Sequence, residues 1–162
     1  MMLAKLETLL DVHGIHYTHT IHKPAFTARD VAKAEDLPVS RIAKCVVFFG
    51  EEGYGIAVIP GDRKVDLHEL RALFNQPHLR LATEEELTKL FPESELGAMP
   101  PFGNHVGLPV YVDSSLAVYD TIAFNAGTHR DVVHMNFLDF ERLSGATILP
   151  CAVAVSARGA SG

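Results

Sequence analysis

Two neighbouring hydrophobic stretches constrain the fold of this chain more than any other feature of the sequence. They are "RIAKCVVFFG" at residues 41–50 and "YGIAVIPG" at residues 54–61. Successive side chains of a β-strand point to opposite faces, and here both sets of alternate positions are largely hydrophobic. Because only residues 51–53 separate the two stretches, we predict a β-hairpin. Other elements must cover both faces of this hairpin, which places it at the centre of a sheet.

Helical and strand patterns are interleaved along the rest of the chain. Leucines recur at helical spacing near the N-terminus, and Thr27 and Thr83 each precede an acidic residue three positions later, as in a capping box. Short turns such as residues 127–130 favour antiparallel strand pairs. We expect helices at 3–10, 28–37, 67–74, 84–91 and 137–143, and further strands at 15–22, 109–113, 121–127, 131–137 and 147–156.

The predicted fold class is therefore mixed α+β, with a curved, barrel-like mixed sheet that helices partly cover. A chain of 162 residues, 48% of them hydrophobic, is the size of one domain with a real core. We assign residues 1–152 to this domain. We expect residues 153–162 to form the end of a C-terminal strand and a flexible tail.

Charge and cysteine content exclude several classes of protein. The formal net charge of −6 argues against a free-standing, high-affinity nucleic-acid binder, and we expect no DNA partner. Cys45 and Cys151 lie far apart in strand-like segments, which predicts neither a disulfide framework nor a zinc knuckle and favours a cytoplasmic location. The first ten residues form an amphipathic helix pattern, not a signal peptide. No hydrophobic run approaches membrane-spanning length, so we expect no membrane partner.

Lys44 is a cation inside a hydrophobic strand. It shares one predicted face of the strand with Ile42, Val46 and Phe48. Burial of an unpaired ammonium group costs several kcal/mol, so Lys44 needs either a partner or a pocket. Two interpretations follow: an edge position from which the side chain reaches solvent, or a pocket floor that faces an anionic ligand.

A glycine- and proline-rich loop, "GAMPPFG" at residues 97–103, interrupts the middle of the chain. Prolines fix φ and glycines permit close approach of backbone to a ligand. Such a stiff loop can hold unpaired N–H groups toward a substrate carbonyl, as an oxyanion site requires. The alternative is a loop that only connects two elements and whose hydrophobic side chains pack into the core.

Histidines suggest one candidate site and one false lead. His129 lies in the turn "NAGTHRD" between two predicted strands, where it can lean over the mouth of a sheet. His13, His16, His19 and His22 occur at every third position. In a strand this spacing sends successive side chains to opposite faces, so we expect no metal site there. No serine or cysteine lies in a nucleophile-elbow context.

Five segments together resemble the YbaK/EbsC family, which includes the inserted editing domain of bacterial prolyl-tRNA synthetases and free-standing relatives. They are "HKPAFTARDVA", "RIAKCVVF", "VIPGDRKVDL", "GAMPPFG" and "FNAGTHRDVVHM". The "GAMPPFG" loop matches the G-x-x-x-P pattern of this family at Gly97 and Pro101. The resemblance extends over about residues 2–150 and implies a mixed α/β fold with a central barrel-like sheet.

The resemblance also implies a mechanism and a set of site residues. Water attacks the aminoacyl ester with help from the terminal hydroxyl of the substrate, so no protein nucleophile, metal ion or other cofactor is expected. The pocket that receives the aminoacylated 3′ end would use Lys44 to hold a phosphate and His129 to select the amino acid. Catalytic roles fall to Lys44, Gly97, Pro101 and His129, and substrate contacts to Ala98, Met99, Pro100, Phe102, Gly127 and Thr128.

The function implied is that of a free-standing trans-editing aminoacyl-tRNA deacylase. Ala-tRNA(Pro) is the first expected substrate and Cys-tRNA(Pro) the second. A synthetase or an elongation factor would supplement affinity for tRNA, as would a basic patch of Arg29, Lys33 and Arg41, with Lys64 a weaker candidate. Two alternatives stay open: a module of the same fold that binds tRNA, a nucleotide or a small ligand without catalysis, and a hydrolase of small aminoacyl esters.

Overall fold

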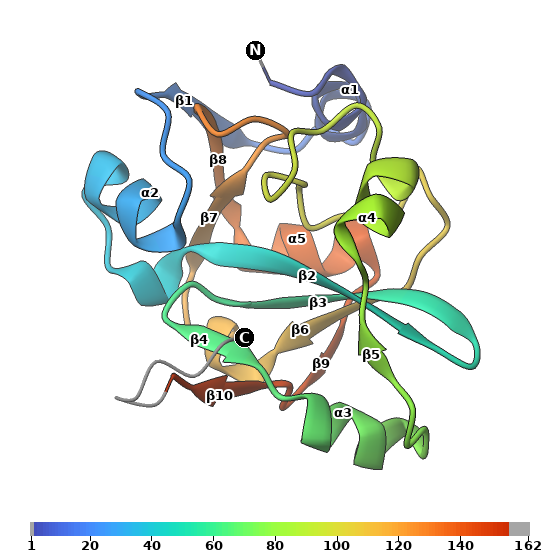
Figure 1. Ribbon diagram of the computed structural model, residues 1–162. Coiled ribbons are helices and arrows are strands. Elements are labelled where there is room, and N and C mark those ends of the chain that lie inside the picture. The colour runs from blue at the N-terminus through green and yellow to red at the C-terminus, as the bar shows by residue number, and fades with distance from the viewer. Residues whose placement is uncertain (1, 156–162) are drawn as a thin grey trace.

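The computed structural model describes residues 2–155, which form a mixed α+β fold (Figure 1). Its largest sheet has five strands in the order β5-β2-β3-β6-β9, and two smaller sheets have the orders β1-β8-β7 and β10-β4. The five-stranded sheet consists of β2 (Ala43–Gly50), β3 (Gly53–Pro60), β5 (Arg80–Leu81), β6 (Val110–Asp113) and β9 (Thr147–Leu149). The smaller sheets contain β1 (Tyr17–Ile21), β7 (Thr121–Asn125), β8 (Asp131–Asn136), β4 (Arg63–Val65) and β10 (Ala152–Ala154).

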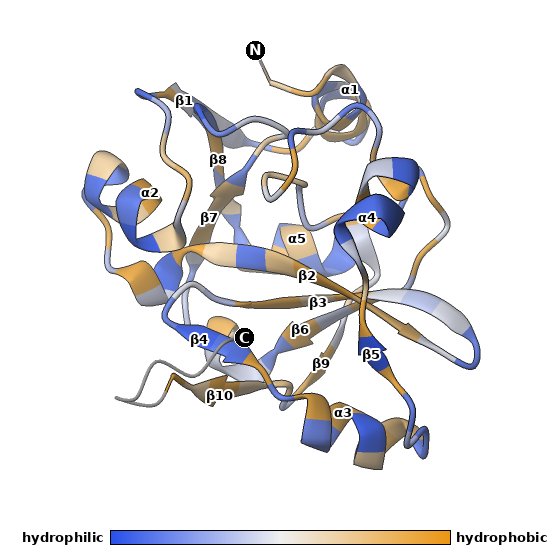
Figure 2. Cartoon of the chain, in the orientation of Figure 1, coloured by the Kyte–Doolittle hydropathy of each residue, from blue (hydrophilic) through white to orange (hydrophobic). Residues whose placement is uncertain are grey.

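The predicted central hairpin is present, and hydrophobic residues cover both of its faces. β2 and β3 pair antiparallel from Ala43↔Pro60 to Gly50↔Gly53. Alternate residues of β3 enter different cores: Ile56 and Val58 join one hydrophobic cluster, and Ala57 and Ile59 join another. Figure 2 shows the hydrophobic colouring of both strands over most of their length. The position of the hairpin therefore follows directly from its sequence pattern.

The remaining pairings are not all antiparallel. β3 pairs parallel with β6, and β6 pairs parallel with β9, because the chain returns to the sheet after long crossover segments and not after short turns. The sheets do not close into a barrel within the described residues. Ile42, just before β2, forms one isolated parallel bridge with Ala123 of β7, and β2 and β7 are also in contact there.

Five α-helices flank these sheets within residues 2–155, and two of them begin at the predicted threonines. Thr83 forms a full capping box with Glu86, and Thr27 accepts a hydrogen bond from the Asp30 amide. In Figure 1, α1 and α4 lie above the β2–β3 hairpin and α3 lies below it. The helices are α1 (Ala4–Val12), α2 (Ala28–Glu35), α3 (Leu67–Phe74), α4 (Glu84–Leu90) and α5 (Phe137–Ser144), with single 3-10 turns η1 (Val39–Arg41) and η2 (Ser114–Leu116).

The last predicted strand, residues 147–156, is instead divided into β9 and β10. Buried Asp113 explains the division, because its Oδ1 accepts hydrogen bonds from the amides of Cys151 at 2.8 Å and Ala152 at 2.9 Å. The chain turns around this carboxylate, and β10 then pairs with β4. The part of the expected tail at residues 156–162 lies outside the described residues. No helix in residues 2–155 is both long and hydrophobic enough to cross a membrane.

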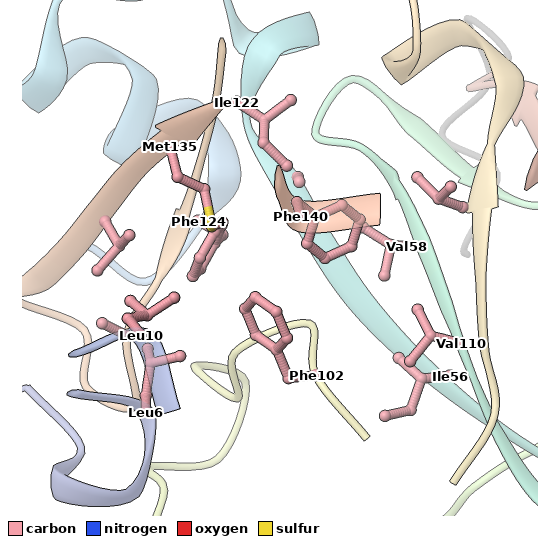
Figure 3. Packing of buried hydrophobic residues seen from close by; sticks show 14 of the residues in the cluster. Leu6, Leu10, Ile56, Val58, Phe102, Val110, Ile122, Phe124, Met135 and Phe140 are labelled. Atoms are coloured by element: carbon pink, nitrogen blue, oxygen red, sulfur yellow. The ribbon is translucent and has the colours of Figure 1, made fainter. Parts of the chain in front are cut away.

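Phe102 anchors the glycine- and proline-rich loop in the largest core cluster. Only 6% of its surface is exposed, and its ring packs edge-on against Phe124 at 5.7 Å and Phe140 at 5.4 Å between ring centroids. Figure 3 shows this ring among side chains from α1, the central hairpin, β7 and α5. The loop is therefore held in place by a side chain near its C-terminal end.

We predict that Phe102→Ala lowers the free energy of unfolding by about 3–5 kcal/mol, because it leaves a cavity where three rings meet. Leu138→Ala is the control, since 68% of the Leu138 surface is exposed, and it should cost less than about 0.5 kcal/mol. Urea unfolding of both variants measures the difference. Equal losses would show that the loop is not anchored through this ring.

Candidate functional site

The glycine- and proline-rich loop is joined to the β7–β8 turn by a short series of hydrogen bonds. The Glu95 amide donates to the Gly127 carbonyl at 2.8 Å, and the Gly127 amide donates to the Ala98 carbonyl at 2.9 Å. The side chain of Glu95 accepts from the His129 amide at 2.7 Å. Figure 1 shows the two segments side by side near α1. Residues about 30 positions apart thus form one rigid edge, which we call the loop–turn edge (residues 95–99 and 127–129).

The His129 imidazole closes this edge. Its Nε2–H donates to the Leu96 carbonyl at 2.8 Å, since a carbonyl oxygen can only accept. In the neutral ring Nδ1 is then an acceptor, and this buried atom has no hydrogen-bond partner within residues 2–155. Phe26, which is 72% exposed, lies against the same imidazole with 4.7 Å between ring centroids. His129 therefore offers one unused acceptor beside an exposed aromatic ring.

Gly97 has a backbone conformation that favours glycine. Its φ is +85°, and a Cβ placed there would lie 3.6 Å from Cε1 of His129, which is an ordinary contact. A side chain at this position would thus be strained by the dihedral angle and not by lack of space. Among the described residues, the amides of Gly97 and Met99 make no hydrogen bond, whereas the Ala98 amide donates to Glu95. Both N–H groups thus keep a hydrogen-bonding capacity that the described residues do not use, and Gly97 itself lies on the exposed part of the loop.

The side chains after Gly97 face inward. Ala98 and Met99 are 0% and 6% exposed, and Pro100 and Pro101 are buried with them. The Pro100 carbonyl accepts from the Phe102 amide at 2.8 Å and lies 3.9 Å from Sγ of Cys45. We therefore assign Phe102 to anchoring the loop, and the accessible groups of this segment belong to its backbone.

β2 presents two adjacent residues to different surroundings. Cys45 faces the loop, and burial raises the pKa of its thiol to about 12, so the thiolate is not available as a nucleophile. Lys44 shares its face of the strand with Val46 and Phe48 and is half-buried. Burial lowers the pKa of Lys44, and the charge of Asp62 acts in the opposite direction. Lys44 thus lies neither in a sealed core nor in bulk solvent.

Gly127 and Thr128 shape the turn. A Cβ at Gly127, whose φ is +100°, would lie 2.8 Å from Cβ of Leu3. Thr128 Oγ1 donates to Asp131 Oδ2 at 2.6 Å and accepts from the Asp131 amide at 3.0 Å. Thr128 therefore orders the turn through Asp131, and Gly127 allows the turn to pack closely against Leu3. The contacts of these two residues with substrate stay a prediction.

Asp131 is a buried carboxylate that sequence reasoning did not single out. It is 0% exposed, and its Oδ1 lies 2.6 Å from Nε2 of His19. Burial alone opposes ionisation, but hydrogen bonds from Thr128 and His19 outweigh it and hold the pKa of Asp131 below its ordinary value. His19 thus pairs with a carboxylate. In residues 2–155 no group of three or more His, Cys, Asp or Glu side chains is placed to hold a metal ion.

Comparison with known proteins identifies the family. The profile of the aminoacyl-tRNA editing domain matches residues 22–143, which is more than half of the chain. The chain belongs to the aminoacyl-tRNA editing domain family. The resemblance noted in the sequence is thereby confirmed, and membership of this family supports a deacylase activity.

Relatives of the editing domain occur within larger synthetases. The proline–tRNA ligase of Fervidobacterium nodosum is 35% identical over 77 residues, which cover 48% of this chain and 13% of the ligase. That of Persephonella marina is 28% identical over 116 residues, which cover 70% of this chain and 20% of the ligase. The chain therefore matches only a small part of these proteins.

Solved structures share the fold over nearly the whole chain. One, described as a "putative trans-editing enzyme for prolyl tRNA synthetase", has a TM-score of 0.82 at 27% identity and covers 93% of this chain and 96% of its own. A second, described as a hypothetical protein, has a TM-score of 0.84 at 21% identity and covers 92% and 99%. The second likeness concerns the fold alone.

The low pKa of Asp131 predicts how stability depends on pH. A carboxylate whose pKa is depressed in the folded state contributes stability above its unfolded value, near 3.9, and loses it as pH falls through the folded value. The difference in unfolding free energy between wild type and Asp131→Asn should therefore be about 1–3 kcal/mol at pH 5 and shrink toward pH 3. Urea unfolding between pH 5 and pH 3 measures the difference, and a constant value would contradict the assignment.

Proposed function

We propose that this editing domain hydrolyses the ester that joins a wrong amino acid to the terminal adenosine of a tRNA. The observation that carries the proposal is the loop–turn edge, where two unused N–H groups and one unused imidazole acceptor lie on a rigid support. Family membership supports the substrate class. The synthetase relatives and the description of the trans-editing structure support tRNA(Pro) as the tRNA. We propose Ala-tRNA(Pro) as the first substrate and Cys-tRNA(Pro) as the second.

In the proposed reaction, the loop backbone stabilises the developing oxyanion. The N–H groups of Gly97 and Met99 donate to the ester carbonyl oxygen as it gains negative charge, and prolines at 100 and 101 keep the loop stiff. Water forms a bond to the carbonyl carbon, the ester C–O bond breaks, and the ribose oxygen leaves as a hydroxyl with the proton that the water loses. No acyl-enzyme is formed, which agrees with the high pKa of the Cys45 thiol.

His129 and Lys44 hold the two ends of the substrate in this proposal. Nδ1 of His129 accepts a hydrogen bond from the amino group or from the attacking water, and its ring limits the size of the amino acid. Lys44 holds the phosphate of the terminal nucleotide, because a half-buried cation is screened less by salt than an exposed one. With a net charge of −6, the chain needs a local basic surface or a partner such as a synthetase or an elongation factor to bind tRNA in the cytoplasm.

The test of this function is single-turnover deacylation of Ala-tRNA(Pro), Cys-tRNA(Pro) and correctly charged Pro-tRNA(Pro) by wild type and Gly97→Ala. We expect wild type to hydrolyse a mischarged tRNA and to spare Pro-tRNA(Pro). Gly97→Ala should lose on the order of a hundredfold in rate, because a residue with a Cβ turns the N–H away from the carbonyl to escape the positive φ.

Two further variants are matched controls. Gly107→Ala introduces the same kind of strain, since Gly107 has a φ of +66° with open space around it, but it lies outside the loop–turn edge. It should cost stability of similar size and leave the rate within about threefold. Met99→Leu preserves the volume of the loop and should also cost little. A fully active Gly97→Ala would reduce the loop to a connection. Binding of mischarged tRNA without hydrolysis would favour the non-catalytic alternative.

A further inference from the structure

A surface hollow lies at the start of β2, next to η1. It has a volume of about 250 Å³, and the residues that matter for its chemistry are Ser40, Pro60, Asp62, Arg63 and Tyr119. Arg41 is not part of the lining but lies over the ring of Tyr119, which is. We propose that this hollow, here called the Arg41–Tyr119 hollow, binds the nucleotide that precedes the terminal adenosine in the single-stranded 3′ end of tRNA. The proposal rests on the proposed function, because it extends the substrate beyond the residue that carries the ester.

Tyr119 and Arg41 lie in contact at the hollow. The Tyr119 hydroxyl lies 2.8 Å from Oγ of Ser40, and the Tyr119 amide donates to the Leu116 carbonyl at 3.2 Å. Cζ of Arg41 lies 5.3 Å from the centre of the Tyr119 ring, in the geometry of a cation–π contact. Aromatic rings and guanidinium planes are the surfaces on which unpaired bases stack in single-stranded RNA complexes. The pair is thus already ordered for a base.

Arg41 also has an unused donor. Its Nε is buried and has no hydrogen-bond partner within residues 2–155. A buried donor without a partner costs about 1–3 kcal/mol, and an anionic oxygen is the acceptor that would recover most of this loss. Arg63 at the start of β4 adds a second cation to the lining. A phosphate group satisfies both observations.

The hollow lies where an RNA strand held by Lys44 would continue. Pro60, in the lining, is the direct β-partner of Ala43, which precedes Lys44. Asp62, also in the lining, is the acidic group that acts on the Lys44 ammonium. Arg41 and Lys44 are three residues apart, or at most about 10 Å along an extended chain. The two cations can therefore contact neighbouring phosphates of one strand.

The hollow has nearby cations that can bind phosphate groups, although the chain as a whole is acidic. The protein carries a formal charge of −6, yet Arg63 lines the hollow and Lys44 interacts with Asp62 in its lining. Phosphate contacts need a local excess of positive charge. Arg41, one residue of the predicted basic patch, contacts the hollow through Tyr119, a residue far from it in sequence.

Binding of uncharged RNA tests the hollow without any need for catalysis. Fluorescence anisotropy compares an acceptor-stem hairpin that ends in CCA with the same hairpin whose two cytidines are deleted. Tyr119→Leu and Arg41→Gln should each weaken binding of the CCA hairpin at least fivefold and leave binding of the shortened hairpin unchanged. Arg41→Gln should also reduce the slope of log K against log salt by about 0.7, the value for one phosphate on a single strand.

Matched variants separate this role from folding and from general charge effects. Arg142→Gln removes an arginine that is 76% exposed and paired with Asp139 on α5, and it should change neither affinity. Tyr119→Phe keeps the ring and removes only the contact with Ser40, so it should bind within twofold of wild type. Unchanged binding of the CCA hairpin by Tyr119→Leu and Arg41→Gln would overturn the proposal. Equal weakening on both hairpins would overturn it as well.

Hydrolysis of an aminoacyl-adenosine by wild type then separates the two proposals. This substrate lacks the preceding nucleotide, so the variants of the hollow should hydrolyse it as fast as wild type while the KM for charged tRNA rises. If wild type hydrolyses neither substrate, the deacylase proposal fails, and the binding data alone decide whether the hollow is an RNA site. If the variants lose both hydrolytic activities equally, the hollow is structural and the proposal is wrong.

Discussion

The candidate site depends on the hydrogen bonds that join the loop around Leu96 to the β7–β8 turn. The exchange between Glu95, Ala98 and Gly127 achieves this, and it leaves the amides of Gly97 and Met99 without partners in residues 2–155. Phe102 pins the far end of the loop in the core. A loop fixed at both ends can hold unpaired donors without collapse, which is the condition for a preorganised oxyanion site.

This arrangement suits a reaction that depends more on the positioning of substrate and water than on a strong protein nucleophile. An aminoacyl ester is already activated, so orientation of water and stabilisation of one oxyanion can supply much of the rate. The protein correspondingly offers buried thiols with high pKa values and an imidazole held by a carbonyl, while its carboxylate–histidine pair at Asp131 and His19 supports the turn. In this account the chemistry of the site therefore belongs to backbone groups. A sequence indicates such a site only through the glycines and prolines that set the direction of those groups.

Local patterns predicted much of this fold, and long-range contacts account for what they missed. The β2–β3 hairpin and the Thr27 and Thr83 caps follow from residues close together in sequence. The parallel pairing of β3 with β6 joins residues 54 positions apart, such as Ile56 and Val110. The division of the last strand depends on Asp113 and Cys151, which are 38 positions apart. Gly97 and His129 were predicted as a site, but the Glu95 and Phe26 contacts that complete it have no signal in local spacing.

The central claim is that substrate meets the protein at the amides of the loop–turn edge. Nuclear magnetic resonance of nitrogen-15-labelled protein tests it with alanyl-3′-amino-3′-deoxyadenosine, in which a stable amide replaces the ester. We expect the largest amide shifts at Gly97, Met99 and His129. Unchanged signals for these residues, with shifts confined to the hydrophobic cleft between α1 and residues 90–106, would contradict the account.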